Sequence, residues 1–378
     1  MGRKSTPPPG NGLALTALQA ACFVGKEELV DILLEYGADI HATPAPFGET
    51  ALTAAVRGGH KIIVDKLLEL GADINQQAPH RLNALQVAAQ NGDVKLAEYL
   101  FQEGADFYGD SGTIALNAAV LFGRYDMAKR LPELGAEVNE TVEGLEHLQS
   151  GAPIHRIRSS EMLQLLLRYG AKINQPACKR GGATALQRVA ANSSIYLMEE
   201  LIERGADVHA PGSEIHGLTA LQAAASQANL EKVKILIEKY GADVNEPRSV
   251  KEGYTTLEAA CCRIAKGAFD AASRFAPGSS EDCSKYDGLE LIDYILGRGA
   301  RVTPFALHIA TAWGHLSMTR LLLCRGSRIT DPPDNDFVIT GWGDDRYLGQ
   351  NALETAKLNG RQEVLEFLQE WPGVVGTC

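Results

Sequence analysis

The sequence predicts an all-α solenoid, a stack of helix-turn-helix repeats in which each repeat packs against the next. Two recurring segments carry this prediction. One is a helix end that closes on glycine, as in LLELGADIN at residues 67 to 75, with near-copies at 33 to 40, 201 to 209 and 236 to 245. The other is a block of small residues, such as TALQAAC from Thr16, which precedes most of these helix ends at a fixed distance. Two blocks kept in phase along a chain indicate one reused structural element.

The closing glycines give the length of the repeat. Glycine closes a helix because it adopts the left-handed conformation without steric cost. Most intervals between these glycines are close to 33 to 35 residues, and two are irregular. The glycines are Gly37, Gly71, Gly104, Gly135, Gly170, Gly205, Gly241, Gly299 and Gly326.

Small residues identify the first helix of each repeat. In TALQAAC, Ala17, Leu18, Ala21 and Cys22 fall at helical spacing, and their size permits close approach of the neighbouring helix. The fifth copy, APIHRIR from Ala152, is weaker than the others. The other copies start at Thr16, Thr50, Asn83, Ile114, Thr184, Thr219, Thr255, Phe305 and Asn351.

The second helix and its loop follow. KIIVDKLLEL places Ile62, Ile63, Leu67 and Leu70 on one broad apolar face, which the helix cannot bury alone. Stacking of the next repeat supplies the missing partner. After Gly71 ends the helix, we expect Asp73 to hydrogen-bond to backbone N–H groups of the loop and Ile74 to be buried.

These blocks resemble the ankyrin repeat, whose consensus carries a TPLHxAA helix, a second helix ending in LLxxGADVN and a β-hairpin loop. The resemblance covers ten candidate repeats from about Leu13 to Trp371. Ala17 in place of proline and Gln19 in place of histidine give the array a likeness to ankyrin arrays of filamentous fungi. The resemblance implies an ankyrin-repeat solenoid with β-hairpin loops.

The expected organisation is a flexible N-terminal arm at 1–12 and a single array at 13–378, with insertions at about 267–288 and 330–350. The fifth repeat is short, so its two helices must be short or tightly joined. The first part of the insertion at 267–288 could extend a helix, and its APGSSED segment indicates a loop.

Composition excludes several classes of partner. The chain carries 47 acidic and 36 basic side chains, a formal net charge of −11, and the basic residues are interspersed with acids. We therefore expect no nucleic acid and no membrane partner. No signal peptide or membrane-spanning run is evident, and the seven cysteines contain no CxxC pair. We expect a cytoplasmic or nuclear monomer.

No catalytic, metal or cofactor site is predicted. GDSG at 109–112 is similar to the nucleophile segment of serine proteases, but its place between GAD and IALNAA favours a turn. His308 and His315 lie seven residues apart, about 10.5 Å along a helix, too far to share a metal. We expect both histidines to be structural, and at least one of Cys261 and Cys262 to pack in the core.

A protein partner is the expected ligand. The resemblance implies contacts at hairpin tips and at exposed positions of the first helices, which line a concave groove. Aromatic residues and arginines dominate interface energetics, so those at these positions are the strongest candidates. Aromatics of the segment after Gly326 are added, although that segment is equally well explained as a cap on the array. The predicted partner-binding residues are Phe23, Arg57, Asn91, Phe122, Asn192, Gln227, Arg263, Trp313, Phe337, Trp342 and Tyr347.

Two functions follow as hypotheses. The favoured one is a non-enzymatic adaptor or scaffold that offers a rigid groove to another protein. The alternative is an unconventional enzyme or small-molecule-binding protein with a pocket between the groove and the C-terminal insertions. It would use Glu258, Arg263, His308, Trp313 and the acids of the final loop, Asp331, Asp334, Asp336, Asp344 and Asp345. An open groove lined by Phe23, Phe122 and Trp313 would favour the adaptor, and a deep enclosed cavity the alternative.

Overall fold

The computed structural model describes residues 15–42, 48–77, 81–142, 151–178, 182–192, 194–251, 253–274, 288–333, 339–341, 344–346 and 348–372. The chain divides into two compact units, Met1–Gln175 and Pro176–Cys378. Each is described separately. The predicted arm at 1–12 lies outside the described residues, and the single array over 13–378 stays a prediction.

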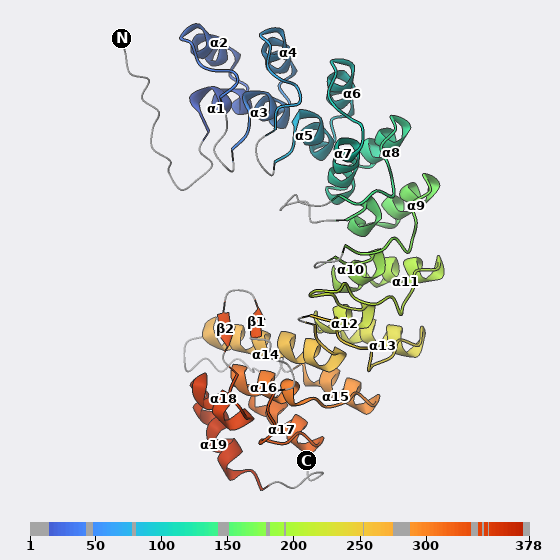
Figure 1. Ribbon diagram of the computed structural model, residues 1–378, viewed down its shortest axis with the longest axis vertical. Helices are drawn as coiled ribbons and strands as arrows, with labels where there is room; N and C mark the ends of the chain where they lie inside the picture. Colours follow the sequence, from blue (N-terminus) through green and yellow to red (C-terminus); the bar gives the residue numbers. More distant parts are fainter. Residues whose placement is uncertain are drawn as a thin grey trace. The chain divides into compact units, whose positions relative to one another are not determined.

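The first unit is a succession of helix pairs (Figure 1). Figure 1 shows the first helices of the pairs side by side in one layer and the second helices in another, here called the inner and outer layers. The pairs are α1 (Ala17–Val24) and α2 (Glu27–Glu35), α3 (Ala51–Gly58) and α4 (Lys61–Glu69), α5 (Ala84–Asn91) and α6 (Val94–Gln102), α7 (Asp110–Leu121) and α8 (Tyr125–Glu133), and the 3-10 helix η1 (Pro153–Arg156) and α9 (Ser160–Arg168).

The second unit repeats this arrangement. Two short strands, β1 (Ile339–Gly341) and β2 (Asp344–Arg346), pair antiparallel before its last helix pair. The pairs are α10 (Ala185–Asn192) and α11 (Ile195–Glu203), α12 (Ala220–Ala225) and α13 (Leu230–Glu238), α14 (Thr256–Arg274) and α15 (Leu289–Gly297), α16 (Pro304–Trp313) and α17 (Leu316–Cys324), and α18 (Ala352–Leu358) and α19 (Gln362–Glu370). The predicted all-α solenoid is confirmed.

Small side chains of the inner layer form much of the core. Ala54, Ala55, Ala88 and Ala89 are fully buried where α3 and α5 stack. Alanine allows two helix backbones to approach closely, which explains why the TALQAA block is reused. In the outer layer Ile63 and Leu67 are buried, as the helical spacing predicts. The prediction was wrong for Ile62 and Leu70, which are exposed because they lie at the margins of the buried face.

A side-chain cap begins several of the first helices, as Thr219 does for α12. Thr219 accepts a hydrogen bond from the Gln222 backbone N–H, and the Gln222 side chain accepts one from the Thr219 N–H at 3.0 Å. The remaining amide hydrogens of Gln222 go to the carbonyls of Glu246 and Pro247 in the following loop, at 3.2 and 3.1 Å. Gln222 therefore ties α12 to the next loop, and Gln187 ties α10 to the carbonyls of Ala210 and Pro211 in the same way.

The GADIN segment closes the second helix as predicted. Gly71 has φ of 88°, and Asp73 accepts a hydrogen bond from the Asn75 N–H at 2.9 Å. Asn75 in turn accepts from the N–H of Asp106 in the next repeat at 2.7 Å. The recurring segment therefore contacts its neighbours in the framework. Ile74, which was expected to be buried, is only half-buried.

A second link joins the end of one first helix to the following repeat. We call it a cross-repeat cap: a side chain of the following repeat donates to the last carbonyls of the preceding first helix. His60 Nε2 donates to Phe23 O at 3.1 Å, and Arg124 Nε to Gln90 O at 3.0 Å. In the second unit Lys232 and Arg361 donate to Ala190 O and Ala312 O, at 2.9 and 3.0 Å. Carbonyls at a helix end have no partner within the helix, so these bonds satisfy them.

Two expected irregularities appear. In the fifth repeat the first helix is reduced to the four-residue η1, which confirms that this repeat is short. In the eighth, α14 continues for 19 residues to Arg274, so the start of the insertion does extend the helix. The APGSSED segment lies outside the described residues. Among the described helices none is long and apolar enough to cross a membrane.

The turn between first and second helix offers a stability test. Gly25, Gly59 and Gly92 hold left-handed conformations there, but the seventh repeat has Ala228 at φ 56°. A residue with a Cβ pays about 1–2 kcal/mol in this conformation, and glycine costs about 0.5–1 kcal/mol in unfolded-state entropy. We predict that Ala228→Gly raises the free energy of unfolding by about 0.5–1 kcal/mol in urea titrations. A decrease would show that Ala228 is not strained.

Candidate partner-binding surface

The outer layer is closed by bonds between successive second helices. In the first unit Lys66 pairs with Asp31, Arg130 with Glu98 at 2.6 Å, and the Tyr169 hydroxyl donates to Glu133 at 3.1 Å. The second unit has equivalent bonds from Lys239 to Glu199 at 2.7 Å, Tyr294 to Glu238 at 2.9 Å, and Arg325 to Asp293. Each exposed pair contributes little stability. Together they occupy many polar groups of this layer.

The inner layer leaves several predicted residues exposed. Phe23 and Phe122, at the ends of α1 and α7, are 44% and 45% exposed. Asn192, Gln227 and Arg263 are exposed as well. The structure therefore places these five side chains on the surface, and their role in binding a partner stays a prediction.

Arg57 and Asn91 are engaged in the framework. Arg57 donates to Glu49 at 2.5 Å and to Gln90 of the next repeat at 3.0 Å. The Asn91 amide donates to Val56 O and Arg57 O, both at 3.1 Å, and so forms the cross-repeat cap of α3. Both side chains hold the second and third repeats together, a role that their position in the sequence did not reveal.

Trp313 was expected to be exposed on the groove. This prediction was wrong, because Trp313 is only 5% exposed. The α16 helix lies between α14 and α18 and is buried along its whole length from Phe305 to Trp313. Arg361 of the last repeat also reaches over its end to Ala312 O. Trp313 is therefore a core residue. Phe337, Trp342 and Tyr347 lie outside the described residues.

Polar groups suggested for a catalytic pocket are committed to packing. Glu258 is fully buried and accepts from Arg248 and Thr303, each at 2.6 Å, and from the Thr255 N–H at 2.8 Å. His308 is also fully buried, with Nδ1 2.7 Å from the Thr355 hydroxyl and Nε2 donating to Asp331 O at 3.1 Å.

The remaining candidates for chemistry are structural too. His315 accepts from the Met318 N–H at 3.3 Å and so caps α17, which confirms its structural role. Cys261 is in the core, and burial raises the pKa of its thiol well above the usual value. Within the described ranges no group of three or more His, Cys, Asp and Glu side chains is placed to hold a metal ion.

GDSG was expected to be a turn, but α7 already begins at Asp110 and only Gly109 precedes it. The reason is that Gly109, with φ of 60°, makes the entire turn into the helix. The Ser111 hydroxyl donates to Asp106 O at 2.8 Å. This serine therefore helps to hold the loop at the start of α7.

An open hollow lies where the short fifth repeat meets the fourth. One part, of about 320 Å³, is lined by Leu121, Phe122 and Arg158 among others. The other, of about 440 Å³, is lined by Tyr125, Gln164 and Arg168 among others. Both parts share Gly123, Ser159 and Met162, so they form one continuous feature, which we call the α7–α9 notch.

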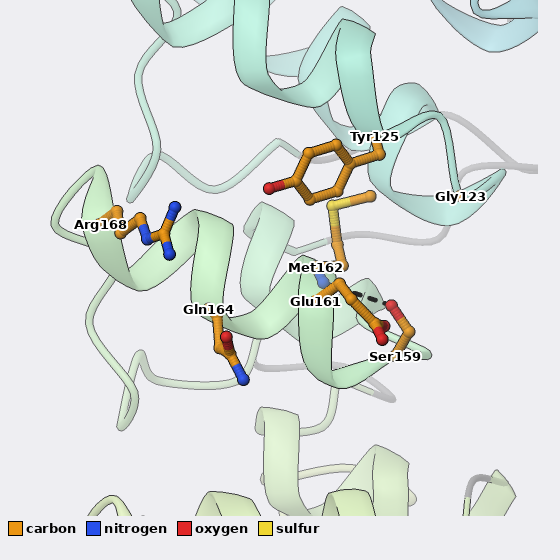
Figure 2. A pocket seen from close by; sticks show the side chains of 7 residues that line it. All are labelled: Gly123, Tyr125, Ser159, Glu161, Met162, Gln164 and Arg168. Atoms are coloured by element: carbon orange, nitrogen blue, oxygen red, sulfur yellow. Dashed lines mark hydrogen bonds between the residues drawn. The ribbon is translucent and has the colours of Figure 1, made fainter.

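Figure 2 shows the side chains of the larger part of the notch. The ring of Tyr125 lies over Met162, with Gln164 and Arg168 on one side and Ser159 and Glu161 on the other. Met162 is 3% exposed and forms the floor, whereas Tyr125 is 40% exposed. Of the notch residues, sequence analysis proposed only Phe122. The short fifth repeat was the available signal, but its geometry could not be derived from spacing.

Comparison with known families agrees with this architecture. A family model described as ankyrin repeats (3 copies) matches residues 5–78 and 77–142, and a model described as ankyrin repeat matches 216–248 and 305–335. Matches therefore fall in both compact units. No curated protein matches the chain.

The burial of Trp313 generates a stability prediction. Replacing a buried aromatic side chain by alanine costs about 3–5 kcal/mol, because packing is lost and a cavity is left. We expect Trp313→Ala to lower the free energy of unfolding by about that amount. The matched change at the exposed Phe23 should cost less than about 1 kcal/mol. Equal losses in urea titrations would contradict the difference in burial.

A buried carboxyl in a predicted contact loop generates a second prediction. Glu246 follows the GADVN segment and is 7% exposed. Burial raises the pKa of this carboxyl, and Thr219 and His209, whose Nδ1 lies 3.5 Å away, oppose this only in part. A raised folded-state pKa means that the charged form penalises folding above that pKa. The penalty disappears as pH falls to the unfolded value of about 4.3.

We therefore expect Glu246→Gln to be more stable than the wild type at pH 7.5. The advantage should shrink toward zero near pH 4. Urea titrations of both proteins at the two pH values measure it, and a variant that is less stable at pH 7.5 would show that the charge is well accommodated.

Proposed function

The chain belongs to the ankyrin repeat family, and from this premise we propose that it is a non-enzymatic adaptor or scaffold. Ankyrin repeats are generally modules for protein–protein interaction. The proposed partner is another protein, bound through the inner layer and the hairpin tips.

The contrast between the two layers carries the proposal. In the outer layer, charged and tyrosine side chains pair with the next repeat, as in Arg130 with Glu98 and Lys239 with Glu199. At the ends of the first helices, Phe23 and Phe122 expose nearly half of their area. Arg263 is exposed and has no ion pair within the described parts of the chain. Aromatic and arginine side chains without internal partners are the usual anchors of a protein interface.

The enzyme or small-molecule alternative has less support. It depended on Glu258, His308 and Trp313 lining a pocket, and all three are buried in framework contacts. The notch is open and its lining mixes apolar, neutral and charged groups, which suits a peptide or protein surface better than an enclosed substrate.

We further propose that the protein acts as a monomer in the cytoplasm or nucleus, with no nucleic acid or membrane partner. The net charge of −11 supports the absence of nucleic-acid and anionic membrane partners, because the protein would repel a polyanion. The basic residues are also interspersed with acids along the sequence and form no basic run.

Partner recovery by the full-length protein tests the adaptor proposal. We expect Phe23→Ser and Arg263→Glu to reduce recovery of specific partners at least tenfold, since loss of an interface anchor typically costs 2 kcal/mol or more. Quantitative mass spectrometry of affinity-purified material measures the effect. The control is Tyr196→Ser, because Tyr196 lies in the outer layer and is 83% exposed. Unchanged recovery with both inner-layer variants would refute the proposed surface.

A further inference from the structure

The α7–α9 notch lies at a turn that no side chain of the following repeat fills, unlike the turns at Gly25 and Gly92. A Cβ placed on Gly25 would lie 2.2 Å from the ring of His60, and one on Gly92 would lie 2.8 Å from Cδ of Arg124. His60 and Arg124 directly precede the second helix of the following repeat. At Gly123 nothing lies within 4 Å of the same point. The turn at Gly123 is therefore open, as is the turn at Gly59, whereas the turns at Gly25 and Gly92 are covered.

Ser159 explains the open turn. It holds the position of His60 and Arg124, because it directly precedes α9. Its short side chain accepts a hydrogen bond from the Met162 N–H at 3.2 Å and does not reach Gly123. The shortened η1 also leaves the notch bordered by Phe122 on one side and Met162 below. The open space therefore has an apolar floor and wall that fit one inserted side chain.

Two arginines place positive charge at the notch. Arg168 stands two residues before Gly170, whereas Glu35, Glu69 and Glu133 stand two residues before Gly37, Gly71 and Gly135. Arg158 occupies the position of the turn glycine in most other repeats. No left-handed glycine closes η1, because the chain leaves it at Ile157 in an extended conformation. In a chain of net charge −11, a pair of arginines at one hollow is a local exception.

Neither arginine is neutralised internally. Arg158 and Arg168 are exposed and make no hydrogen bond or ion pair with any residue that the structure describes. By contrast, Arg57 and Arg130 of the same unit are held by Glu49 and Glu98. Glu161 also lines the notch, but it lies seven residues from Arg168, about 10.5 Å along α9. The end of the notch near Arg168 therefore complements a carboxylate.

We infer that the α7–α9 notch binds an acidic linear peptide of a partner protein, which inserts one aromatic side chain beside Gly123 and pairs its carboxylates with Arg158 and Arg168. The aromatic ring would take the place that the His60 ring takes beside Gly25 and would lie against Met162, a favourable sulfur–aromatic contact. Arginine suits carboxylates because its planar donors match them bidentately. The inference rests on the proposed adaptor function and names a partner class for one part of its surface.

Selection from a random 12-residue peptide display library on the full-length protein tests the inference. We expect the selected peptides to be enriched in Asp and Glu and to share an aromatic residue. Synthetic versions, measured by fluorescence polarisation, should bind Arg158→Glu/Arg168→Glu at least tenfold more weakly than the wild type. Lys26→Glu/Lys95→Glu, which makes the same charge change at exposed lysines of the same unit, should keep the affinity within twofold.

A second variant tests the open turn without changing the arginines. Ser159→His should fill the space beside Gly123 as His60 fills that beside Gly25, and His315 shows that histidine at this position also caps the helix. We expect at least tenfold weaker peptide binding, with far-ultraviolet circular dichroism unchanged. Ser194→His, the same change before α11 in the second unit, should bind normally.

Three outcomes would overturn the inference: no selected peptide, selected peptides without acidic enrichment, or equal affinity for wild type, the double arginine variant and Ser159→His. None of them affects the adaptor proposal, whose test uses Phe23 and Arg263, neither of which lines the notch. Conversely, peptide binding at the notch with unchanged recovery in the Phe23 and Arg263 variants would leave this inference standing and refute the proposed inner-layer surface.

Discussion

The stacking of each first helix on the next is the constraint on which this protein depends. A first helix of about eight residues is too short to be stable by itself in water. Its alanines become core residues only when the next first helix covers them, as Ala54 and Ala55 show. Cross-repeat caps such as Arg124 on Gln90 O add a polar link to the same junction. Stability in such a fold is a sum over neighbouring repeats.

This dependence on the neighbour also decides which groups remain for a partner. Where the following repeat supplies a long side chain, as His60 does at Gly25 and Arg124 at Gly92, it covers the preceding turn. Trp313 shows that even a large aromatic residue at the end of a first helix can be buried. At Gly123 the following repeat supplies only the short Ser159 and a first helix reduced to η1, and the turn stays open beside a hollow. The outer layer offers less, because its acids already pair with the next repeat.

The fold was predictable because blocks of small residues and helix-closing glycines recur with the period of the repeat. The left-handed Gly71, the buried Ala54 and the structural His308 all follow from their place in the repeat. Exposure was less predictable, since it depends on the neighbouring repeat. Position in the helix alone suggested that Trp313 and Asn91 face a partner. In the structure Arg361 reaches over the end of α16, where Trp313 lies, and the Asn91 side-chain amide caps α3. The notch was hidden for the same reason, because it arises from a side chain that Ser159 does not supply.

Hydrogen–deuterium exchange of the full-length protein, with and without a selected acidic peptide, tests the central claim most directly. The claim is that the uncovered turn after α7 is part of a binding site, whereas the covered turns at Gly25 and Gly92 are not. Amides of residues 121–125 should exchange faster than those of the covered turns at 23–27 and 90–94, and only the former should slow markedly when the peptide binds, together with residues 158–168. Equal exchange at the three turns, or slowing confined to other parts of the chain, would contradict the claim.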